Sequence, residues 1–204
     1  MPEAAGISAI VLAAGRATRF GSHKLLQPLA LDGCSAPMLA HSVRPWLQVF
    51  DTLTLVVRPG DHALRAALPA SAAVRWVEAV NSDLGMGHSL AAGVAANRDC
   101  AGWVIGLADM PRLPAAVIAQ VRDALQRGAT LAAPFHLAQR GHPAGFGRIY
   151  ADELLALSGD AGARHILERD AARLARIPVQ HPGVLLDVDR LSDIEPLNVI
   201  EETP

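Results

Sequence analysis

The residues best suited to chemistry lie in a loop of small side chains that follows a short apolar run. Residues Ile7–Leu12 form that run, and Ala13–Gly15 follow it directly. Small residues let the backbone approach a ligand closely, and the exposed N–H groups of such a loop attract anions. Arg19 and Lys24 add full positive charge beside those dipoles. This combination is typical of a triphosphate site, whereas the alternative is a tight strand-to-helix turn that carries two solvated cations.

The loop departs from the two best-known phosphate-binding patterns. The Walker pattern needs Lys directly after its last Gly, whereas two residues separate Gly21 from Lys24. The dinucleotide fingerprint needs Gly where this chain has Ala17 and Phe20. The second apolar run also leads into Arg58 rather than into an acid for a ribose hydroxyl. Both patterns are therefore excluded.

Two later segments carry acids of the type that binds a divalent cation. Asp109 follows another apolar run, and at the carboxyl end of a strand its carboxylate would point into the ligand cleft. Oxygen ligands of this kind suit Mg²⁺. Asp187 and Asp189 share one face of an extended segment, where they repel unless a cation lies beside them. The alternative for Asp109 is an ordinary turn or cap residue.

Apolar runs and helix-like segments alternate along the chain. The predicted strands are Ile7–Leu12, Thr52–Val57, Val74–Val77, Trp103–Leu107 and Thr130–Pro134. The predicted helices are Pro37–Val49, His62–Ala67, His88–Ala96 and Pro114–Arg127, with Pro114 in a first turn and Gly128 as a cap. Continuous rather than alternating apolar strands predict an α/β fold with a mostly parallel sheet covered on both faces.

Composition narrows the class of protein. The chain has 204 residues, 51% of them hydrophobic and 19% charged, so we expect one folded domain over residues 1–204. A net charge of -2 without a basic run argues against nucleic acid as a partner. Cys34 and Cys100 lack CxxC spacing, no apolar stretch is long enough for a bilayer, and no basic segment precedes the first apolar run. We therefore expect a cytoplasmic protein with no membrane partner.

The first loop also carries a family resemblance. Leu12-Ala13-Ala14-Gly15, followed by Arg19, Gly21 and Lys24, resembles the signature loop of the MobA-like nucleotidyltransferases, and within them the molybdenum cofactor cytidylyltransferases. The resemblance implies a Rossmann-like three-layer α/β fold whose first loop, Leu12–Gly15, binds the nucleotide. It also implies catalytic roles for Arg19, Lys24 and Asp109.

Four later segments match the same family in the same order, and the first is Gly85-Met86-Gly87-His88-Ser89-Leu90. In the family this segment lies against the nucleoside, which implies nucleotide-binding roles for Gly85, Gly87 and Ser89. The two glycines would leave room for a flat base, and the Ser89 hydroxyl can donate a hydrogen bond. Taken alone, the segment would be an ordinary helix cap.

Two of the matching segments point to the acceptor side of the site, the first because related enzymes carry Gly-His-Pro there and the second through its expected geometry. In Arg140-Gly141-His142-Pro143 the resemblance points to His142, for which the alternative is a structural histidine. The segment Gly159–Arg164 is predicted to be a loop that opens a helix, with Arg164 one turn inside, suited to an acceptor phosphate. The predicted acceptor-binding residues are His142, Asp160 and Arg164.

The acidic segments complete the match. The resemblance implies that Asp109 and Asp189 hold Mg²⁺, with Asp189 as the principal ligand of the second metal arm. Close relatives usually carry Thr after that acid, where this chain has Arg190. The departure bears on the details of the metal arm and on the acceptor.

The implied reaction is nucleotidyl transfer, with a nucleoside triphosphate, CTP favoured, as one partner and a phosphorylated small molecule of the molybdopterin type as the other. Contact with an enzyme that receives the cofactor is implied as well. Ala14 favours a pyrimidine, because guanylyl relatives tend to have Gly there. The alternatives are a guanylyl- or other nucleotidyltransferase with a different acceptor, a nicotinamide-dependent oxidoreductase and a nucleotide-sensing domain.

Overall fold

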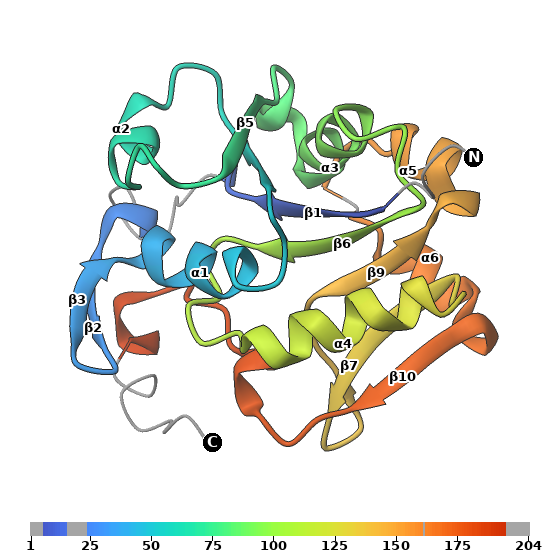
Figure 1. Cartoon of the computed structure of the whole chain (residues 1–204). Coiled ribbons are helices and arrows are strands. Elements are labelled where there is room, and N and C mark those ends of the chain that lie inside the picture. Colours follow the sequence, from blue (N-terminus) through green and yellow to red (C-terminus); the bar gives the residue numbers. More distant parts are fainter. Residues whose placement is uncertain (1–5, 16–23, 161, 195–204) are drawn as a thin grey trace.

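A single large β-sheet organises the chain (Figure 1). The structure, a computed structural model, describes residues 6–15, 24–160 and 162–194. Seven strands of the sheet follow the order β10-β7-β9-β6-β1-β4-β5, an eighth, β8, pairs with β7, and β2 and β3 form a separate hairpin. The strands are β1 Ile7–Leu12, β2 Pro28–Leu31, β3 Cys34–Pro37, β4 Leu53–Val57, β5 Val74–Glu78, β6 Gly102–Leu107, β7 Leu131–His136, β8 Gln139–Arg140, β9 Ala144–Gly147 and β10 Leu174–Pro178.

Six α-helices accompany these strands in the described residues. They are α1 Met38–Leu47, α2 His62–Ala66, α3 Met86–Ala95, α4 Ala115–Gln126, α5 Ala151–Leu155 and α6 Arg164–Arg169. The Asp61 carboxylate caps α2 by accepting a hydrogen bond from the Leu64 N–H at 3.4 Å. Gly128 follows α4 with a φ of 97°, the left-handed conformation that glycine tolerates best.

Four of the seven strand pairs in the large sheet are parallel within the described residues. β1 pairs in parallel with β4 and β6, β4 with β5, and β7 with β10, whereas β9 runs antiparallel between β6 and β7. The fully buried β4, in which all five residues are inaccessible, is typical of a strand covered on both faces. The predicted α/β fold with a mostly parallel sheet is confirmed.

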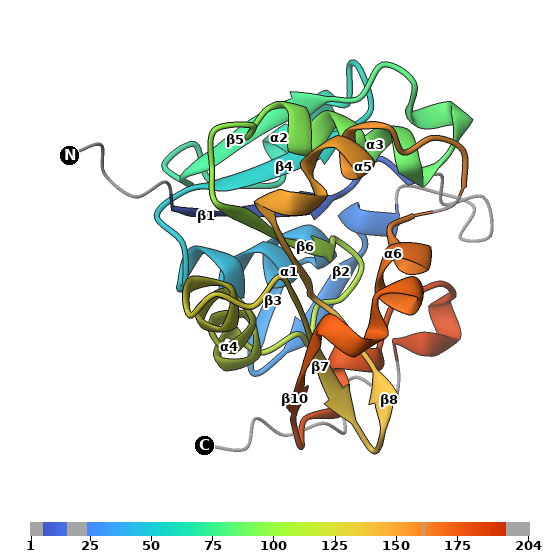
Figure 2. The same ribbon diagram turned by 90° about the vertical axis from the view of Figure 1, so that its right-hand side faces the viewer.

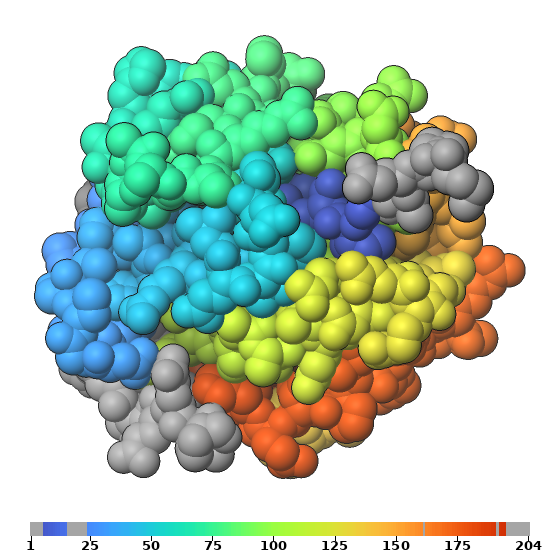
Figure 3. Space-filling view, in the orientation of Figure 1, coloured from blue at the N-terminus to red at the C-terminus, as the bar shows by residue number. Residues whose placement is uncertain are grey.

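Alternate strand residues pack into two separate hydrophobic layers. In β1, Ala9 and Val11 face the layer of α1 and α4, whereas Ile10 and Leu12 face the layer of α3, α5 and α6. Figure 2 shows the sheet edge-on between helices on both sides. On the face seen in Figure 3, α1 and α4 lie side by side over the sheet. The expected three-layer arrangement is therefore present.

One glycine explains how closely α1 approaches the sheet. A Cβ added to Gly106 in β6 would lie 2.3 Å from the Trp46 Cζ2 atom, so no larger residue fits beneath that indole. Trp46 itself is fully buried and stacks on Phe50 with ring centroids 6.4 Å apart. The missing side chain in the strand thus accommodates the largest side chain of the helix.

All five predicted strands are present, with ends that differ by at most two residues. The four predicted helices are present too, but α3 begins at Met86, two residues before the predicted His88, and Pro114 precedes α4 instead of lying in its first turn. No prediction covered the hairpin β2–β3, the strands β8, β9 and β10, or α5. Within the described residues, no helix is long and apolar enough to cross a membrane.

Candidate functional site

A cavity of about 850 Å³ opens at the carboxyl ends of β1, β4 and β6. Because these strands are parallel neighbours, their ends meet at one edge of the sheet, where ligands bind in open α/β sheets. We call it the first cavity. Its lining includes most of the predicted nucleotide and metal residues: Leu12, Ala13, Ala14, Gly15, Lys24, Gly85, Ser89, Asp109 and Asp189.

The loop after β1 is held against its neighbouring strands. The Ala13 N–H donates to the Val56 carbonyl at 2.7 Å, and the Ala108 N–H donates to the Leu12 carbonyl at 3.0 Å. Ala13 and Ala14 are buried, whereas Gly15 is exposed at the cavity. The predicted catalytic residue Arg19 lies outside the described residues.

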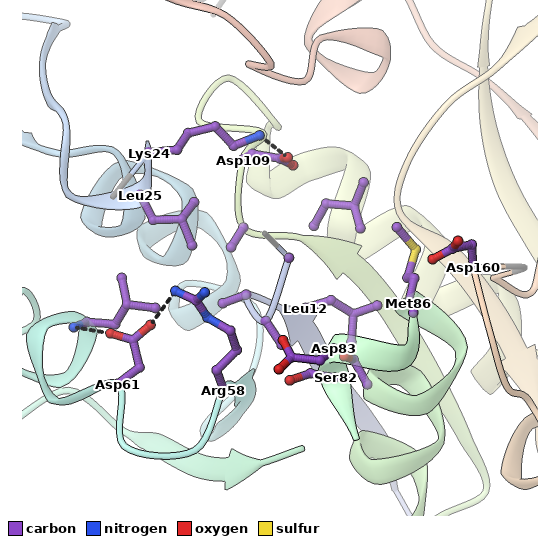
Figure 4. Close-up of a pocket in the computed structure, with 18 of the residues that line it drawn as sticks. Leu12, Lys24, Leu25, Arg58, Asp61, Ser82, Asp83, Met86, Asp109 and Asp160 are labelled. Atoms are coloured by element: carbon purple, nitrogen blue, oxygen red, sulfur yellow. Dashed lines mark hydrogen bonds and ion pairs between the residues drawn. The ribbon is translucent and has the colours of Figure 1, made fainter. Parts of the chain in front are cut away.

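Lys24 lies between the two predicted metal ligands. Its Nζ is 2.7 Å from Asp109 Oδ2 and 3.3 Å from Asp189 Oδ1. The Lys24 side chain is only 11% exposed. Burial alone would lower the pKa of Lys24, but the charges and hydrogen bonds of Asp109 and Asp189 outweigh it, so the pKa is raised above 10.5. Figure 4 shows the Lys24 side chain bonded to Asp109 on one side of the cavity. Met86 and Asp160 lie on another side.

The backbone brings the two acids together. The Val188 N–H donates to the Asp109 carbonyl at 2.9 Å, which ties the segment 187–189 to the end of β6. Val188 is fully buried, so the acids on either side of it turn away from the core. Asp189 is directed into the first cavity, and Asp187, whose burial raises its pKa, lies within electrostatic range of Asp109 and Asp189.

The Asp193 side chain holds the acidic segment 187–189 in place through hydrogen bonds. Its Oδ2 accepts hydrogen bonds from the Asp189 N–H at 2.9 Å and the Arg190 N–H at 2.7 Å. These backbone donors hold the pKa of Asp193 below its ordinary value. Asp193 was not predicted from the sequence, because its carboxylate accepts from N–H groups that precede it in the chain, the reverse of the familiar Asx-turn pattern. Arg190 contributes its backbone here, and its side chain is exposed.

The donor atoms fit a divalent cation that also binds substrate phosphates. Asp109 Oδ1 is buried without a hydrogen-bond partner among the described residues, which leaves a carboxylate oxygen available. No group of three or more His, Cys, Asp and Glu side chains in the described ranges forms a metal site. Mg²⁺ commonly takes only one or two carboxylates and completes its shell with water and phosphate oxygens. Two carboxylates therefore suffice for Mg²⁺ shared with a triphosphate.

The glycines before and within α3 serve a purpose other than the expected one. A Cβ on Gly85 would lie 2.1 Å from the Gly159 carbonyl carbon, and one on Gly87 would lie 2.7 Å from the Ser158 carbonyl oxygen. The Gly87 N–H donates to the Gly159 carbonyl at 2.8 Å. The absent side chains therefore make room for the backbone of residues 158–160 rather than for a flat base. Gly85 still lines the first cavity, whereas Gly87 does not.

A second cavity of about 820 Å³ adjoins the first. Leu12, Met86 and Leu107 line both. Two predicted acceptor-binding residues, His142 and Arg164, line the second cavity, whereas Asp160 lines the first. The structure thus separates Asp160 from the residues with which it was grouped.

Arg164 does not lie one turn inside a helix. It is the first residue of α6, which has only six residues, and its side chain is 79% exposed. Its Nε donates to Glu168 Oε1 at 2.6 Å, four residues along the helix. An anion at Arg164 would therefore be bound by the guanidinium rather than by a long helix dipole.

His142 is partly buried at the edge of the second cavity. Its Nδ1 has no hydrogen-bond partner among the described residues. Burial lowers the pKa of His142, the nearby charge of Arg140 lowers it further, and Asp187 acts in the opposite direction. The ring is thus held neutral between the second cavity and the acidic segment.

The sequence model of the MobA-like NTP transferase domain matches residues 9–176 of the chain. The chain belongs to the MobA-like NTP transferase family. Both curated relatives described here are proteins named bifunctional protein GlmU. The protein from Sphingopyxis alaskensis is 33% identical over 175 residues, which cover 83% of this chain and 36% of the relative. The protein from Bradyrhizobium diazoefficiens is 37% identical over 163 residues, 76% of this chain and 34% of the relative. The MobA-like chain thus spans about a third of the length of these relatives.

Solved structures share the fold over almost the whole length. Rv0371c from Mycobacterium tuberculosis H37Rv gives a TM-score of 0.80 at 29% identity, covering 96% of this chain and 98% of that chain. A complex of Rv0371c with manganese gives 0.77 at 28% identity, covering 96% and 99%. Molybdopterin-guanine dinucleotide biosynthesis protein A from Archaeoglobus fulgidus gives 0.59 at 17% identity, covering 95% and 98%. At 17% identity, the likeness to the Archaeoglobus fulgidus protein indicates a shared fold and nothing about activity.

Counted over the described residues alone, the linings of the two cavities in this MobA-like domain carry opposite net charges. Two cations, Lys24 and Arg58, face five aspartates in the first: Asp61, Asp83, Asp109, Asp160 and Asp189. The second holds three arginines and one glutamate: Arg140, Arg164, Arg176 and Glu168. Sequence reasoning missed Arg58, Asp61 and Asp83, whose position after strands or a turn could have indicated them. An acidic cavity suits a ligand that arrives with cations, and a basic one suits an anion.

Proposed function

We propose that this chain is a nucleotidyltransferase that transfers CMP from CTP to a phosphorylated acceptor of the molybdopterin type and releases pyrophosphate. The observation that carries the proposal is the position of Lys24 between Asp109 and Asp189, beside the loop Ala13–Gly15 in the first cavity. The family match supports the reaction class. The basic second cavity next to it supports an anionic acceptor.

In this reaction an oxygen of the acceptor phosphate attacks the α-phosphorus of CTP. The new bond joins that oxygen to the α-phosphorus, and the bond from the α-phosphorus to the bridging oxygen breaks as pyrophosphate leaves. Such transfers depend on positioning and charge neutralisation rather than on a protein nucleophile. The ammonium of Lys24 and the N–H groups of the loop would stabilise the departing pyrophosphate.

Asp109 and Asp189 would hold Mg²⁺. When bound, this ion neutralises charge on the phosphate oxygens at the reacting phosphorus. The unpartnered Oδ1 of Asp109 supports such a role, and the manganese complex of the similar Rv0371c supports the use of a divalent cation. Lys24 would then exchange a carboxylate partner for phosphate oxygens.

CTP is favoured over GTP on steric grounds. Ala14 is 3% exposed and lines the first cavity, and we expect its methyl group to narrow the base pocket against a purine. One methyl group discriminates only by about tenfold to a few hundredfold, so the preference is one of degree.

The test is a pyrophosphate-release assay with Mg²⁺, each of CTP, GTP, ATP and UTP, and a panel of phosphorylated acceptors. We expect CTP with a phosphorylated pterin to give the highest kcat/KM. Thermal shifts with each triphosphate should rank CTP first. A GTP preference would overturn the base assignment and keep the reaction class, whereas no pyrophosphate with any combination would overturn the proposed reaction.

A further inference from the structure

The hairpin β2–β3 is attached to the molecule apart from the main sheet. Within the described residues its two strands pair only with each other, and an isolated two-stranded hairpin is marginally stable, so it depends on contacts with its surroundings. Leu29 and Leu31 of β2 pack with Val188 in a small hydrophobic cluster that is separate from the two layers on the main sheet. Figure 1 shows the hairpin beside the red segment that follows β10. Leu25, which follows Lys24 directly, packs against the same cluster, so the cluster also supports the lysine of the candidate site.

The acidic segment 187–189 lies between this hairpin and the loop that follows β6. On one side, the fully buried Val188 side chain packs on the hairpin. On the other side, the Val188 N–H donates to the Asp109 carbonyl at 2.9 Å. The position of Asp189 relative to Asp109 therefore depends on how closely the hairpin holds the segment against the loop.

Arg112 joins the loop after β6 to the tip of the hairpin. Its Nη1 donates to Asp32 Oδ1 at 2.5 Å, and the Arg112 side chain is only 6% exposed. A buried guanidinium is costly without a carboxylate partner, so this contact favours the position in which the hairpin tip meets the loop. The Arg112 backbone also touches the chain that leads to the acids, since a Cβ on Gly183 would lie 2.0 Å from the Arg112 carbonyl oxygen. We call the hairpin, the Arg112–Asp32 ion pair and the segment 183–189 the clamp.

The turn at the hairpin tip does not require the charge of Asp32. Asp32 and Gly33 have φ values of 53° and 73°. They separate Leu31 from Cys34, which are paired across the hairpin. Two-residue turns with both φ values positive favour Asn-Gly as well as Asp-Gly. Asp32→Asn would therefore keep the turn and remove only the negative charge that faces Arg112.

We infer that Arg112 is a positioning residue of the candidate site, and that its ion pair with Asp32 holds the clamp closed around the acidic segment. The closed clamp keeps Lys24 and Asp189 beside Asp109. Arg112 and Asp32 lie outside the linings of both cavities described above, so their effect on the chemistry is indirect. The inference rests on the proposed function for the chemical role of Lys24 and the acids. The clamp itself is a property of the chain alone and can be tested without turnover.

The test follows the reactivity of Lys24, which is the only lysine of the chain. Its side chain is 11% exposed and lies between two carboxylates, so an amine-reactive reagent should modify it slowly in the wild type. We expect Arg112→Ala and Asp32→Asn each to raise this rate about threefold to fivefold relative to the N-terminal amine, the effect of losing one partly exposed ion pair. Peptide mass spectrometry gives both rates. Asp99→Asn, which changes an exposed turn residue before the amino end of β6, is the matched control.

Further variants separate positioning from a general loss of stability. Arg112→Lys keeps a positive charge near Asp32, so Lys24 should be modified more slowly in it than in Arg112→Ala. In the double variant Arg112→Ala/Asp32→Asn, Lys24 should be modified no faster than in Arg112→Ala, because the carboxylate acts through Arg112. Thermal unfolding establishes that each variant is folded at the labelling temperature. Asp32→Asn, which keeps the turn, carries the test if Arg112→Ala does not fold.

Kinetics connect the clamp to the chemistry. With CTP, Mg²⁺ and the acceptor, Asp32→Asn should lower kcat by about tenfold, the usual effect of a residue that orients metal ligands, and leave the KM for the acceptor unchanged. Wild-type labelling of Lys24 in folded Asp32→Asn, additive effects in the double variant, or an unchanged kcat despite faster labelling would each overturn the inference. If Asp32→Asn is labelled faster but the wild type releases no pyrophosphate, the proposed reaction alone is refuted.

Discussion

The ammonium of Lys24 lies 2.7 Å from the carboxylate of Asp109, although 85 positions separate the two residues in the chain. Lys24 is also the only lysine in a sequence whose other long cationic side chains are all arginine. Because its pKa is raised in the folded state, the stabilisation from this pair is fully present below about pH 10.5 and is lost as the pH rises through the raised value. At neutral pH the pair is therefore intact.

Replacing Lys24 tests its role toward the phosphates. Lys24→Ala should lower kcat by about 10²–10³-fold, the usual loss when one preorganised donor to a transition state is removed. Lys24→Arg keeps the charge but not the compact shape, so it should recover only part of this activity. Steady-state kinetics with CTP provide the measurement. Near-normal turnover in Lys24→Ala would mean that Lys24 does not act on the phosphates.

The single lysine also permits a direct binding measurement. An amine-reactive reagent can modify only Lys24 and the N-terminal amine, so peptide mass spectrometry follows each site separately. We expect Mg²⁺ and CTP to protect Lys24 and to leave the N-terminal amine equally reactive. Unchanged labelling of Lys24 at saturating CTP would contradict its placement beside the triphosphate.

The acids should differ in their effect on stability. Repulsion between Asp109 and Asp189 alone predicts that neutralising either leaves stability unchanged or raises it, but Lys24 lies between them. Asp109→Asn leaves a largely buried ammonium with a weaker partner and should lower the free energy of unfolding by about 1–2 kcal/mol. Asp189 is 53% exposed, so Asp189→Asn should cost less than about 0.5 kcal/mol. Urea denaturation of both variants gives the comparison, and a larger loss in Asp189→Asn would contradict it.

Activity and ligand-induced stabilisation should respond to the two acids as one unit. Each Asn variant should lose nearly all turnover and most of the thermal shift caused by Mg²⁺ with CTP. Because both serve one ion, the double variant should be little worse than the worse single variant. A double-mutant cycle on both readouts makes the measurement. Additive effects would mean that the acids do not share a metal.

His142 should give the stability a specific pH dependence. Its folded-state pKa is lowered below 6.5 by burial, so the unfolded chain binds the proton first as the pH falls. Its contribution is therefore present above pH 6.5 and is lost as the pH falls toward the lowered value. When the pH is lowered from about 7.5 to about 5.5, the free energy of unfolding should fall less in His142→Gln than in the wild type. Urea denaturation at each pH gives the measurement. Equal losses would place the ring in a solvated position.

The turn between β7 and β8 predicts a stabilising substitution. Leu137 and Ala138 have φ values of 47° and 66°, a left-handed conformation that non-glycine residues rarely adopt, and Leu137 is 84% exposed. Two-residue hairpins of this kind favour Asn-Gly. Replacing Leu137-Ala138 with Asn-Gly should raise the free energy of unfolding by about 1 kcal/mol, as measured by thermal and urea denaturation. No gain would mean that the turn adopts another conformation in solution.

The strands and the position of the candidate site could be predicted where the local hydrophobic pattern matches the burial that the fold imposes. The strand ends that carry Leu12 and Asp109 follow continuous apolar runs, and such runs are buried wherever they lie in a parallel sheet. The loop charges and acids could be assigned because the carboxyl ends of parallel strands meet at one edge. The antiparallel β9 was missed because Ala144–Gly147 is short and rich in Gly and Ala, which have a low preference for strands. Its hydrogen-bond partners, β6 and β7, come from earlier parts of the chain.

The missed site features depend on contacts between segments far apart in the chain. The role of Gly85 follows from the backbone of Gly159, and no local pattern reports that approach. Arg176 acquires its partner Phe135 only when β10 pairs with β7. The separation of Asp160 from His142 likewise depends on how two cavities divide the space above the sheet. Tertiary geometry determines such details, and spacing along the chain does not.

The side chains shared by the two cavities couple their contents. Met86 is 47% exposed, borders both cavities, and is anchored at Gly85 and Gly87, where the backbone of residues 158–160 leaves no room for a methyl group. A ligand that moved Met86 in one cavity would therefore reshape the other, and the affinities of the two cavities for their ligands would then be linked. Such linkage is reciprocal: whatever factor the first substrate imposes on the second, the second imposes on the first.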